Sequence, residues 1–464
     1  MTELAHLVAS REVSPVEVTQ AHLDRIARLD PKLNAYVTVT ADLALAAARV
    51  AEAAVVAGRP LGSLHGVPFG LKDVFDTKGV RTTAGSRILA ERIPDADATV
   101  TRRLVEAGGI LLGKLQMVEF AFGADGVNDR YGTPWNPWDM AIHRVCGGSS
   151  SGAGAAVAAG MCPGALGSDT GGSVRIPASL CGLSGLKPTY GRVSRAGVLP
   201  LAWTMDHVGP MTRTAGDLAL MLGVIAGPDP LDPTSSEVPV PDYVAALSGE
   251  VDGIRVGVLR EYFVDDAAPE QRAAVEAAGQ TLEGLGATIE DTQLPAMPMS
   301  VAAKQTVLAP EAYAYHEAWL KTRAADYGSA VRARILAGAF VTGTEYVNGQ
   351  RLRTLLRNDI DRLLARYDVL LAPSTAFAAP PVAEKTVELG GQSVPVAMNL
   401  SRYTGVFNLS GHPAASVPCG FTAEGLPIGL QIVGRWFDES TVLRVADAYQ
   451  RATDWHARRP DLVV

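Results

Sequence analysis

The stretch from Cys146 to Pro188 reads CGGSSSGAGAAVAAGMCPGALGSDTGGSVRIPASLCGLSGLKP. It is rich in glycine and serine, but apolar runs interrupt it at intervals, which is not typical of a flexible linker. Glycine pairs stand next to a serine twice, at 147–149 and at 171–173. Paired glycines let the backbone turn sharply and bring its own N–H groups close to a ligand. We therefore predict an active site built on backbone, with one serine as the nucleophile.

The composition around this stretch is that of a compact α/β enzyme. The chain has 464 residues, of which 47% are hydrophobic and 19% charged, and its net charge is −8. This length and apolar fraction are enough to bury a large core. The mild acidity and the scattered basic residues give no electrostatic footprint for RNA or DNA. We therefore expect no direct nucleic-acid partner, and an RNA-processing role would need a partner subunit to hold the RNA.

The cysteines and the N-terminal segment indicate a cytoplasmic protein. The four cysteines fit no zinc-site spacing and form no Cys-x-x-Cys pair, so we expect buried free thiols in a reducing compartment. Residues 1–15 lack the basic and apolar regions of a signal peptide. No stretch reaches about 18 uninterrupted apolar residues, so we expect no membrane contact.

Strand and helix patterns alternate along the chain, without an internal repeat, which favours one layered α/β fold. The patterns predict strands over 66–73, 109–113, 253–259, 287–290, 368–372, 414–418 and 428–433. They predict helices over 15–29, 41–57, 97–107, 153–159, 174–181, 215–226, 269–285 and 438–452, with further helices between 301 and 366. We expect Asp30-Pro31 to end the first of these helices.

We predict a single domain over residues 1–464. It would consist of N-terminal helices (about 1–60), a core (about 61–226 and 368–464) and an inserted or cap segment (about 228–367). The Pro- and Asp-rich stretch 228–242 would connect the core to that segment, because it can continue neither a helix nor a central strand.

A nucleophilic serine needs a base, because a free hydroxyl is too weakly acidic to attack an amide at neutral pH. None of the eight histidines lies in the 146–188 stretch, which leaves room for a distant histidine or for a lysine. One alternative uses Ser150, because residues 148–152 match the Gly-x-Ser-x-Gly nucleophile elbow of Ser-His-Asp α/β-hydrolases. That elbow must follow a buried strand, and residues 136–145 have the composition of a loop.

Several motifs, in order along nearly the whole chain, resemble the amidase signature family. They are GVPFGLKD (66–73), GGSSSG (147–152), GSDTGGSVRIPA (167–178), GLKPT (185–189), NLSGHP (408–413) and GLQIVG (429–434). The resemblance implies a mixed, twisted β-sheet with helices on both faces, together with a helical cap. It also implies hydrolysis of an amide without a metal or another cofactor.

The family's catalytic triad, carried over by motif, assigns three residues. Ser173 would be the nucleophile, Ser149 the relaying serine with a cis peptide bond before it, and Lys72 the base. The N–H groups of the second glycine-serine turn would form the oxyanion hole, from Thr170, Gly171, Gly172 and Ser173. Neutral Lys72 requires a lowered pKa, and a strand that turns Val67, Phe69 and Leu71 to the opposite face permits its burial. Asp169 and Arg175 are expected to brace this turn as an ion pair.

The substrate is predicted from the residues expected to surround the triad. Ala121, Phe122 and Gly123 are the predicted substrate-binding residues, and Trp135, Trp138 and Phe377 would add apolar surface. We therefore expect a stand-alone amidase that cleaves a small, partly apolar amide through an acyl-enzyme, with esters or carbamates as further substrates. The expected partner is this small molecule, and a homodimer is allowed.

The alternative is the glutaminase subunit of a tRNA-dependent amidotransferase. In that branch of the family an acidic residue before the Asn-Leu motif helps to hold the α-amino group of glutamine. This chain has Ser401 at the corresponding position, and Ser-Gly-His-Pro (410–413) also resembles stand-alone amidases.

Overall fold

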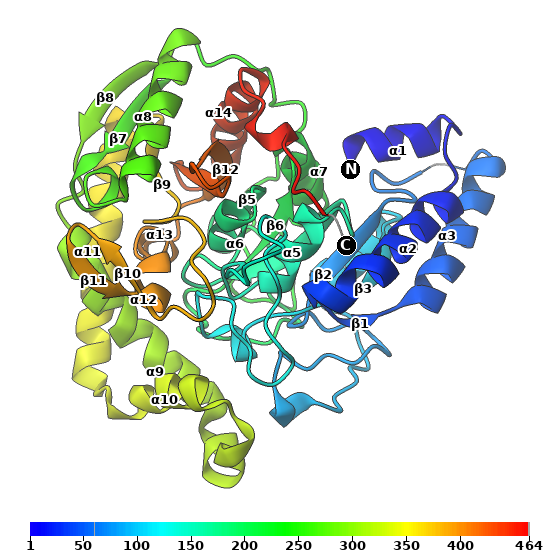
Figure 1. Cartoon of the computed structure of the whole chain (residues 1–464), viewed down its shortest axis with the longest axis horizontal. Coiled ribbons are helices and arrows are strands. Elements are labelled where there is room, and N and C mark those ends of the chain that lie inside the picture. Colours follow the sequence, from blue (N-terminus) through cyan, green and yellow to red (C-terminus); the bar gives the residue numbers. More distant parts are fainter. Residues whose placement is uncertain (60, 463–464) are drawn as a thin grey trace.

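One mixed β-sheet of eleven strands extends through the whole molecule in the computed structural model, which describes residues 1–59 and 61–462 (Figure 1). The strand order is β1-β3-β2-β4-β6-β5-β12-β13-β9-β7-β8, with parallel pairs β2–β3, β2–β4, β7–β8 and β7–β9. The strands are β1 (Tyr36–Val39), β2 (Pro68–Lys72), β3 (Ile110–Leu115), β4 (Gly164–Asp169), β5 (Ser184–Lys187), β6 (His207–Thr212), β7 (Arg255–Leu259), β8 (Thr288–Thr292), β9 (Val369–Pro373), β12 (Ala414–Phe421) and β13 (Pro427–Val433). A separate hairpin joins β10 (Thr386–Leu389) and β11 (Gln392–Pro395).

Helices cover both faces of this sheet, which confirms the predicted fold class. They are α1 (Thr2–Ala9), α2 (Pro15–Leu33), α3 (Ala41–Val56), α4 (Thr99–Glu106), α5 (Ser151–Ala158), α6 (Arg175–Leu180), α7 (Ala215–Ile225), α8 (Pro269–Gly284), α9 (Met297–Arg323), α10 (Ser329–Ala337), α11 (Gly343–Arg366), α12 (Val396–Leu400), α13 (Gly405–Ser410) and α14 (Glu439–Arg451). On one face of the sheet, a single core cluster contains residues of α4, α7, α8 and α14. On the opposite face there are two clusters. One contains residues of α2, α3, α5 and α6, and the other contains residues of α6, α9, α11 and α13. Neighbouring strand residues such as Leu370 and Leu371 belong to opposite clusters, as the two-residue period of a strand requires.

The start of α2 agrees with the sequence prediction, but its end does not. Ser14 accepts hydrogen bonds from the N–H groups of Val16 (3.0 Å) and Glu17 (3.4 Å), and Glu17 accepts one from Ser14 N–H, so the predicted capping box is present. The helix continues past Pro31 to Leu33, because a proline in the last turn leaves only one backbone bond unmade. The Asp30 carboxylate then accepts the N–H of Ala35 at 2.7 Å and closes the helix end.

The segment 228–367 contributes to the sheet as well as to the helical layer. Strands β7 and β8 form one edge of the sheet, while α9 and α10 extend away from it at one end of the molecule (Figure 1). The division of the chain into a core and an inserted segment stays a prediction. In the part of the chain that the structure describes, every helix is too short or too polar to cross a lipid bilayer.

Two parallel strands bring the predicted catalytic segments to one edge of the sheet. β2 pairs with β4 in the register Gly70–Ala165 and Leu71–Leu166, so the carboxyl ends of both strands meet there. Lys72 is the last residue of β2, and the second glycine-serine turn follows directly after β4. Phe69 and Leu71 pack in the core on the face of α4 and α7, as their alternation predicted.

Candidate active site

Lys72 is the centre of a buried hydrogen-bond network. Its side chain is 0% exposed. Its Nζ donates to Ser149 Oγ at 2.7 Å and to Ser168 Oγ at 2.8 Å. The peptide bond between Gly148 and Ser149 is cis. The sequence predicted the proximity of Lys72 to Ser149 but not the second serine.

The surroundings of Lys72 change its protonation. Burial lowers its pKa to about 7, although the nearby carboxylates Asp169 and Asp206 act in the opposite direction. Lys72 can therefore lose its proton close to neutral pH, which an ordinary lysine does not. A neutral amine with a serine hydroxyl at hydrogen-bond distance is suited to accept a proton.

Ser173 lies on the wall of a cavity of about 640 Å³, which we call the Ser173 cavity. It is 7% exposed, and its hydroxyl has no hydrogen-bond partner in the described part of the chain. The N–H of Ser150 donates to the Ser173 carbonyl at 3.3 Å, so the two glycine-serine turns are tied together directly. The hydroxyls of Ser149 and Ser173 are not hydrogen-bonded to each other, and such contacts often tighten only when substrate binds.

The buried ion pair of Asp169 and Arg175 supports the second glycine-serine turn. The two side chains meet at 2.9 Å, as predicted. Burial alone would raise the pKa of Asp169, but Arg175 and Asn408 outweigh it and hold the pKa below its usual range. The Asp169 carboxylate also accepts backbone N–H bonds from Gly172 (2.8 Å) and Val174 (3.1 Å). The carboxylate therefore fixes the shape of the loop that carries Ser173.

This loop geometry removes Gly172 from the predicted oxyanion hole, because the Gly172 N–H already donates to Asp169. Gly172 is needed for space instead: its φ is +128°, and an added Cβ would lie 2.1 Å from Thr404 Oγ1. The N–H groups of Gly171 and Ser173 have no partner among the described residues, and a Cβ added at Gly171 would meet nothing within 4 Å. These two N–H groups remain available to an oxyanion, and Thr170 lies beside them on the cavity wall.

Ser150 does not have the surroundings of a nucleophile elbow. It is fully buried, directly precedes α5 and donates its hydroxyl to the Ser168 carbonyl at 3.3 Å. Residues 147–150 are not part of a strand, and no histidine contacts the Ser150 hydroxyl among the described residues. The α/β-hydrolase alternative therefore lacks both its base and its backbone context.

Part of the predicted substrate wall lines the Ser173 cavity and part lies elsewhere. Ala121, Phe122 and Gly123 all line it. The other three aromatic residues have different neighbours: Trp135 stacks on His143, Trp138 donates its indole N–H to the Cys181 carbonyl, and Phe377 packs in the core. Hydrophobicity alone predicted these three residues, and it does not distinguish a pocket wall from packed interior.

The wall facing Ser173 carries positive charge, which the sequence did not predict. Lys304 on α9, Arg334 on α10 and Arg402 line the cavity, whereas no Asp or Glu is among its described lining residues. Burial lowers the pKa of Lys304 to about 8, so it is still largely protonated at neutral pH. Many of the other lining residues are apolar, among them Phe122, Met297 and Leu308, so the cavity combines apolar surface with cations that can attract an anionic group.

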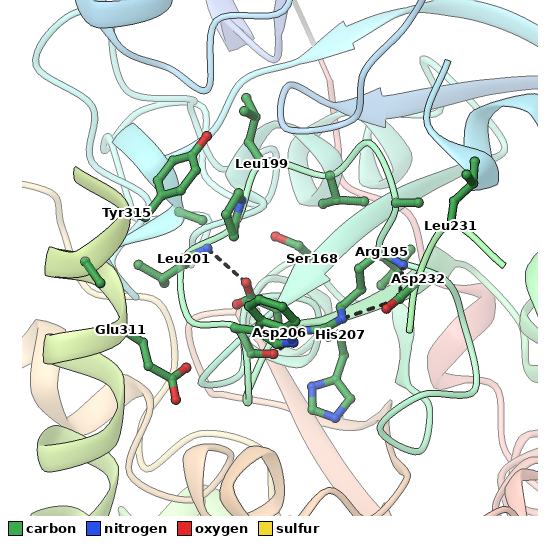
Figure 2. Close-up of a pocket in the computed structure, with 17 residues that line it drawn as sticks. Ser168, Arg195, Leu199, Leu201, Asp206, His207, Leu231, Asp232, Glu311 and Tyr315 are labelled. Carbon is green, nitrogen blue, oxygen red and sulfur yellow. Dashed lines mark hydrogen bonds and ion pairs between the residues drawn. The ribbon is translucent and has the colours of Figure 1, made fainter. Parts of the chain in front are cut away.

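A second cavity, of about 400 Å³, lies next to the network on the Ser168 side, and we call it the Ser168 cavity. Figure 2 shows Ser168 near its centre, with Asp206, His207, Arg195 and Asp232 around it. Asp206 accepts the N–H of Leu201 at 2.9 Å there. Ala121 lines both cavities.

Comparisons with known proteins agree on the family. The sequence profile described as Amidase matches residues 17–443. The chain is 45% identical to a glutamyl-tRNA(Gln) amidotransferase subunit of Chloroflexus aurantiacus, over 100% of both chains. It superimposes with a TM-score of 0.94 on a structure described as a vestigial protein complex that reveals the origins of an s-triazine catabolic enzyme (36% identity, 99% of both chains). The TM-score is 0.80 with a glutamyl-tRNA(Gln) amidotransferase subunit of Thermotoga maritima, at 35% identity over 94% of this chain and 91% of the other.

These relatives overturn two expectations from the sequence. The expectation of a stand-alone amidase that cleaves a small, partly apolar amide is wrong, because the full-length relatives are named as subunits of an amidotransferase. The expectation about partners is wrong for the same reason. It named a small-molecule amide, excluded nucleic acid and allowed a homodimer, whereas the name of these relatives includes a tRNA. Ser401 and the Ser-Gly-His-Pro motif misled the prediction, since each is a local difference within a chain that matches over its whole length.

The nearly complete profile match, the full-length relatives and the solved structures lead to one conclusion. This chain belongs to the amidase signature family, whose enzymes act on carbon–nitrogen bonds.

Proposed function

We propose that this chain is the amide-hydrolysing subunit of a glutamyl-tRNA(Gln) amidotransferase. The observation that carries the proposal is the full-length similarity: the relatives of this name share 41–45% of their residues with the chain. Such an enzyme releases ammonia from an amide donor and passes it to a second site. There a nucleoside triphosphate phosphorylates the glutamyl carboxylate on the tRNA, and ammonia displaces the phosphate to form the amide. Because this chain has a net charge of −8, other subunits would hold the tRNA.

The proposed hydrolysis uses Ser173, Ser149 and Lys72. Neutral Lys72 takes a proton from Ser149 as Ser149 takes one from Ser173, and Ser173 Oγ attacks the carbonyl carbon of the donor amide. The N–H groups of Gly171 and Ser173 hold the oxyanion, which typically contributes about 3–4 kcal/mol per donor. The relay returns the proton to the leaving nitrogen, the C–N bond breaks, and ammonia departs. Water then attacks the acyl-enzyme and releases the acid.

Two further features support the proposal. The Ser168 cavity lies directly beside the Lys72 network and shares Ala121 with the Ser173 cavity, so it offers space into which ammonia can leave on the side away from the donor. The four cysteines are all free and buried, which is usual in a reducing compartment, and we propose a cytoplasmic location on this basis.

The test is reconstitution. The chain is purified together with the subunits that co-purify from its own organism, and ammonia release from glutamine in the presence of a nucleoside triphosphate is measured with and without glutamyl-tRNA(Gln). The expected result is ammonia release together with formation of glutaminyl-tRNA, both abolished by Ser173→Ala. A complex that contains all co-purifying subunits and forms no glutaminyl-tRNA would overturn the proposal.

A further inference from the structure

The inference concerns the amide donor that the Ser173 cavity selects, and it rests on the proposed function. We propose that Lys304 binds a carboxylate of the donor, and that the cavity recognises this carboxylate without requiring an ammonium group on the donor. The donor class would thus be primary amides that carry a carboxylate at the far end, with or without an amino group.

Lys304 is a cation without a counter-charge. It lines the same cavity as Ser173, and its Nζ donates to Ser401 Oγ at 3.2 Å. None of the ion pairs found among the described residues involves Lys304. A half-buried ammonium group loses part of its hydration, and an opposite charge in the cavity would offset that loss.

The other two cations of the wall are already engaged. Arg402 forms an ion pair with Asp266, and the Arg334 guanidinium donates to the Phe122 carbonyl at 2.6 Å. Lys304 is therefore the cation of this wall whose charge is least satisfied by the protein. Gly405 keeps the space around it open, because an added Cβ would approach Nζ to 3.0 Å.

An ammonium group on the donor has no comparable partner. No carboxylate is found among the described residues that line the cavity, and its uncharged polar lining includes Ser401, Asn399 and Gln305. A cationic wall attracts an anion and repels a second cation, so an amino group near the carboxylate gains little here. The cavity volume of about 640 Å³ leaves ample room for a short amide acid.

The experiment compares three amides of equal chain length. Glutamine has a carboxylate and an ammonium group, glutaramate has the carboxylate alone, and pentanamide has neither. With the full complex, kcat/KM for ammonia release from glutaramate should equal or exceed that for glutamine, and should exceed that for pentanamide roughly 10- to 100-fold, the usual worth of a hydrogen bond to a charged group. Equal rates with glutaramate and pentanamide would overturn the inference.

Variants of the two contacting residues separate binding from folding. Lys304→Met should remove the preference for glutaramate, so that within this variant kcat/KM for glutaramate and for pentanamide agree within about twofold. Ser401→Asp places a carboxylate beside Lys304, and this carboxylate should pair with Lys304 and lower kcat/KM for glutaramate roughly tenfold. The neutral variant Ser401→Asn should not lower kcat/KM for glutaramate in this way. Loss of activity towards all three amides in equal proportion would show that Lys304 has only a structural role.

A binding measurement distinguishes this inference from the proposed function. In the Ser173→Ala complex, calorimetry should detect glutaramate binding that Lys304→Met weakens roughly tenfold or more. If the complex forms no glutaminyl-tRNA but this binding persists, the proposed function fails and the carboxylate site stands. If glutaramate binding does not depend on Lys304, the carboxylate site fails whatever the complex does with tRNA.

Discussion

The two cavities beside the Lys72 network differ in charge. The Ser173 cavity presents Lys304, Arg334 and Arg402 and no carboxylate among its described lining residues. The lining of the Ser168 cavity includes three carboxylates, from Asp206, Asp232 and Glu311, against one guanidinium, from Arg195. Both cavities lie close to the same network, because Ser168, which accepts a hydrogen bond from Lys72 Nζ, lines one, and Ser173, whose carbonyl accepts the N–H of Ser150, lines the other.

Under the proposed function, this difference in charge would separate the route of the donor from the route of ammonia. An anionic donor is attracted to the Ser173 cavity and repelled by the acidic Ser168 cavity. Ammonia has neither attraction nor repulsion of this kind, so it can leave through the side that rejects the donor.

The largest expected effect is at Ser173, the nucleophile proposed for the first cavity. Ser173→Ala should lower kcat for ammonia release about 10⁴-fold or more, because removal of the nucleophile abolishes the acyl-enzyme. The measurement is ammonia release from glutamine under single-turnover and steady-state conditions. Activity within tenfold of the native enzyme would eliminate Ser173 as the nucleophile.

The pH profile should follow Lys72. The neutral amine is the active form, so kcat should be constant above about pH 7 and fall roughly tenfold per pH unit below it, because burial lowers the pKa of Lys72 to about 7. Pentanamide is the suitable substrate, since neither its amide nor its chain titrates in this range. A profile that stays flat down to pH 5 would show that another group accepts the proton.

Ser168 tests whether the second cavity contributes to the proton relay. Ser168→Ala removes an acceptor of Lys72 Nζ, and we expect a loss of roughly tenfold in kcat with the acid limb moved to lower pH, since the ammonium form loses a stabilising bond. Ser151→Ala is the matched control: Ser151 is buried nearby, and its hydroxyl has no hydrogen-bond partner in the described part of the chain. Equal effects from both variants would indicate general loosening of the site.

The smallest effects are expected at the exposed lining residues of the two cavities. Val301 and Leu231 are exposed apolar residues that line the Ser173 cavity and the Ser168 cavity, respectively. Val301→Trp should raise KM for the donor about fivefold by narrowing the entry, while Leu231→Trp should change kcat/KM for ammonia release less than about twofold. Steady-state assays of the two variants side by side measure the contrast, and a larger effect from Leu231→Trp would reverse the assignment of the two cavities.

The sequence predicted the catalytic edge of the sheet well, for physical reasons. Val67, just before β2, alternates strictly with Phe69 and Leu71 inside it, so the face of the sheet to which Lys72 points could be predicted directly. The two glycine-serine turns were also recognisable, because glycine is required where backbone approaches backbone, as at Gly148, where an added Cβ would lie 2.7 Å from the backbone nitrogen of Gly126. The strands between them were harder to recognise: β4 reads GALGSD, and its glycines give little strand preference although every residue is buried.

The far wall of the Ser173 cavity could not be predicted from the sequence. Lys304, Arg334 and Ser401 belong to segments that are far apart along the chain, and no local pattern marks any of them as a cavity residue. Ser168 is similar, since it follows β4's apolar residues like any strand-end serine, and only the parallel pairing of β2 with β4 brings it to Lys72. Contacts of this kind depend on tertiary packing, which sequence periodicity does not contain.

The separation of Lys72, Ser149 and Ser173 from Lys304 and Ser401 has a consequence for how this enzyme can evolve. The proposed catalytic groups lie on the central strands and their turns, whereas the residues proposed to contact the far end of the donor lie on α9 and after α12. Substitutions in those outer segments can exchange one amide donor for another while the proposed proton relay, the Asp169–Arg175 ion pair and the oxyanion-binding N–H groups stay intact. New specificities are thus reachable by single steps that preserve catalytic competence at every stage.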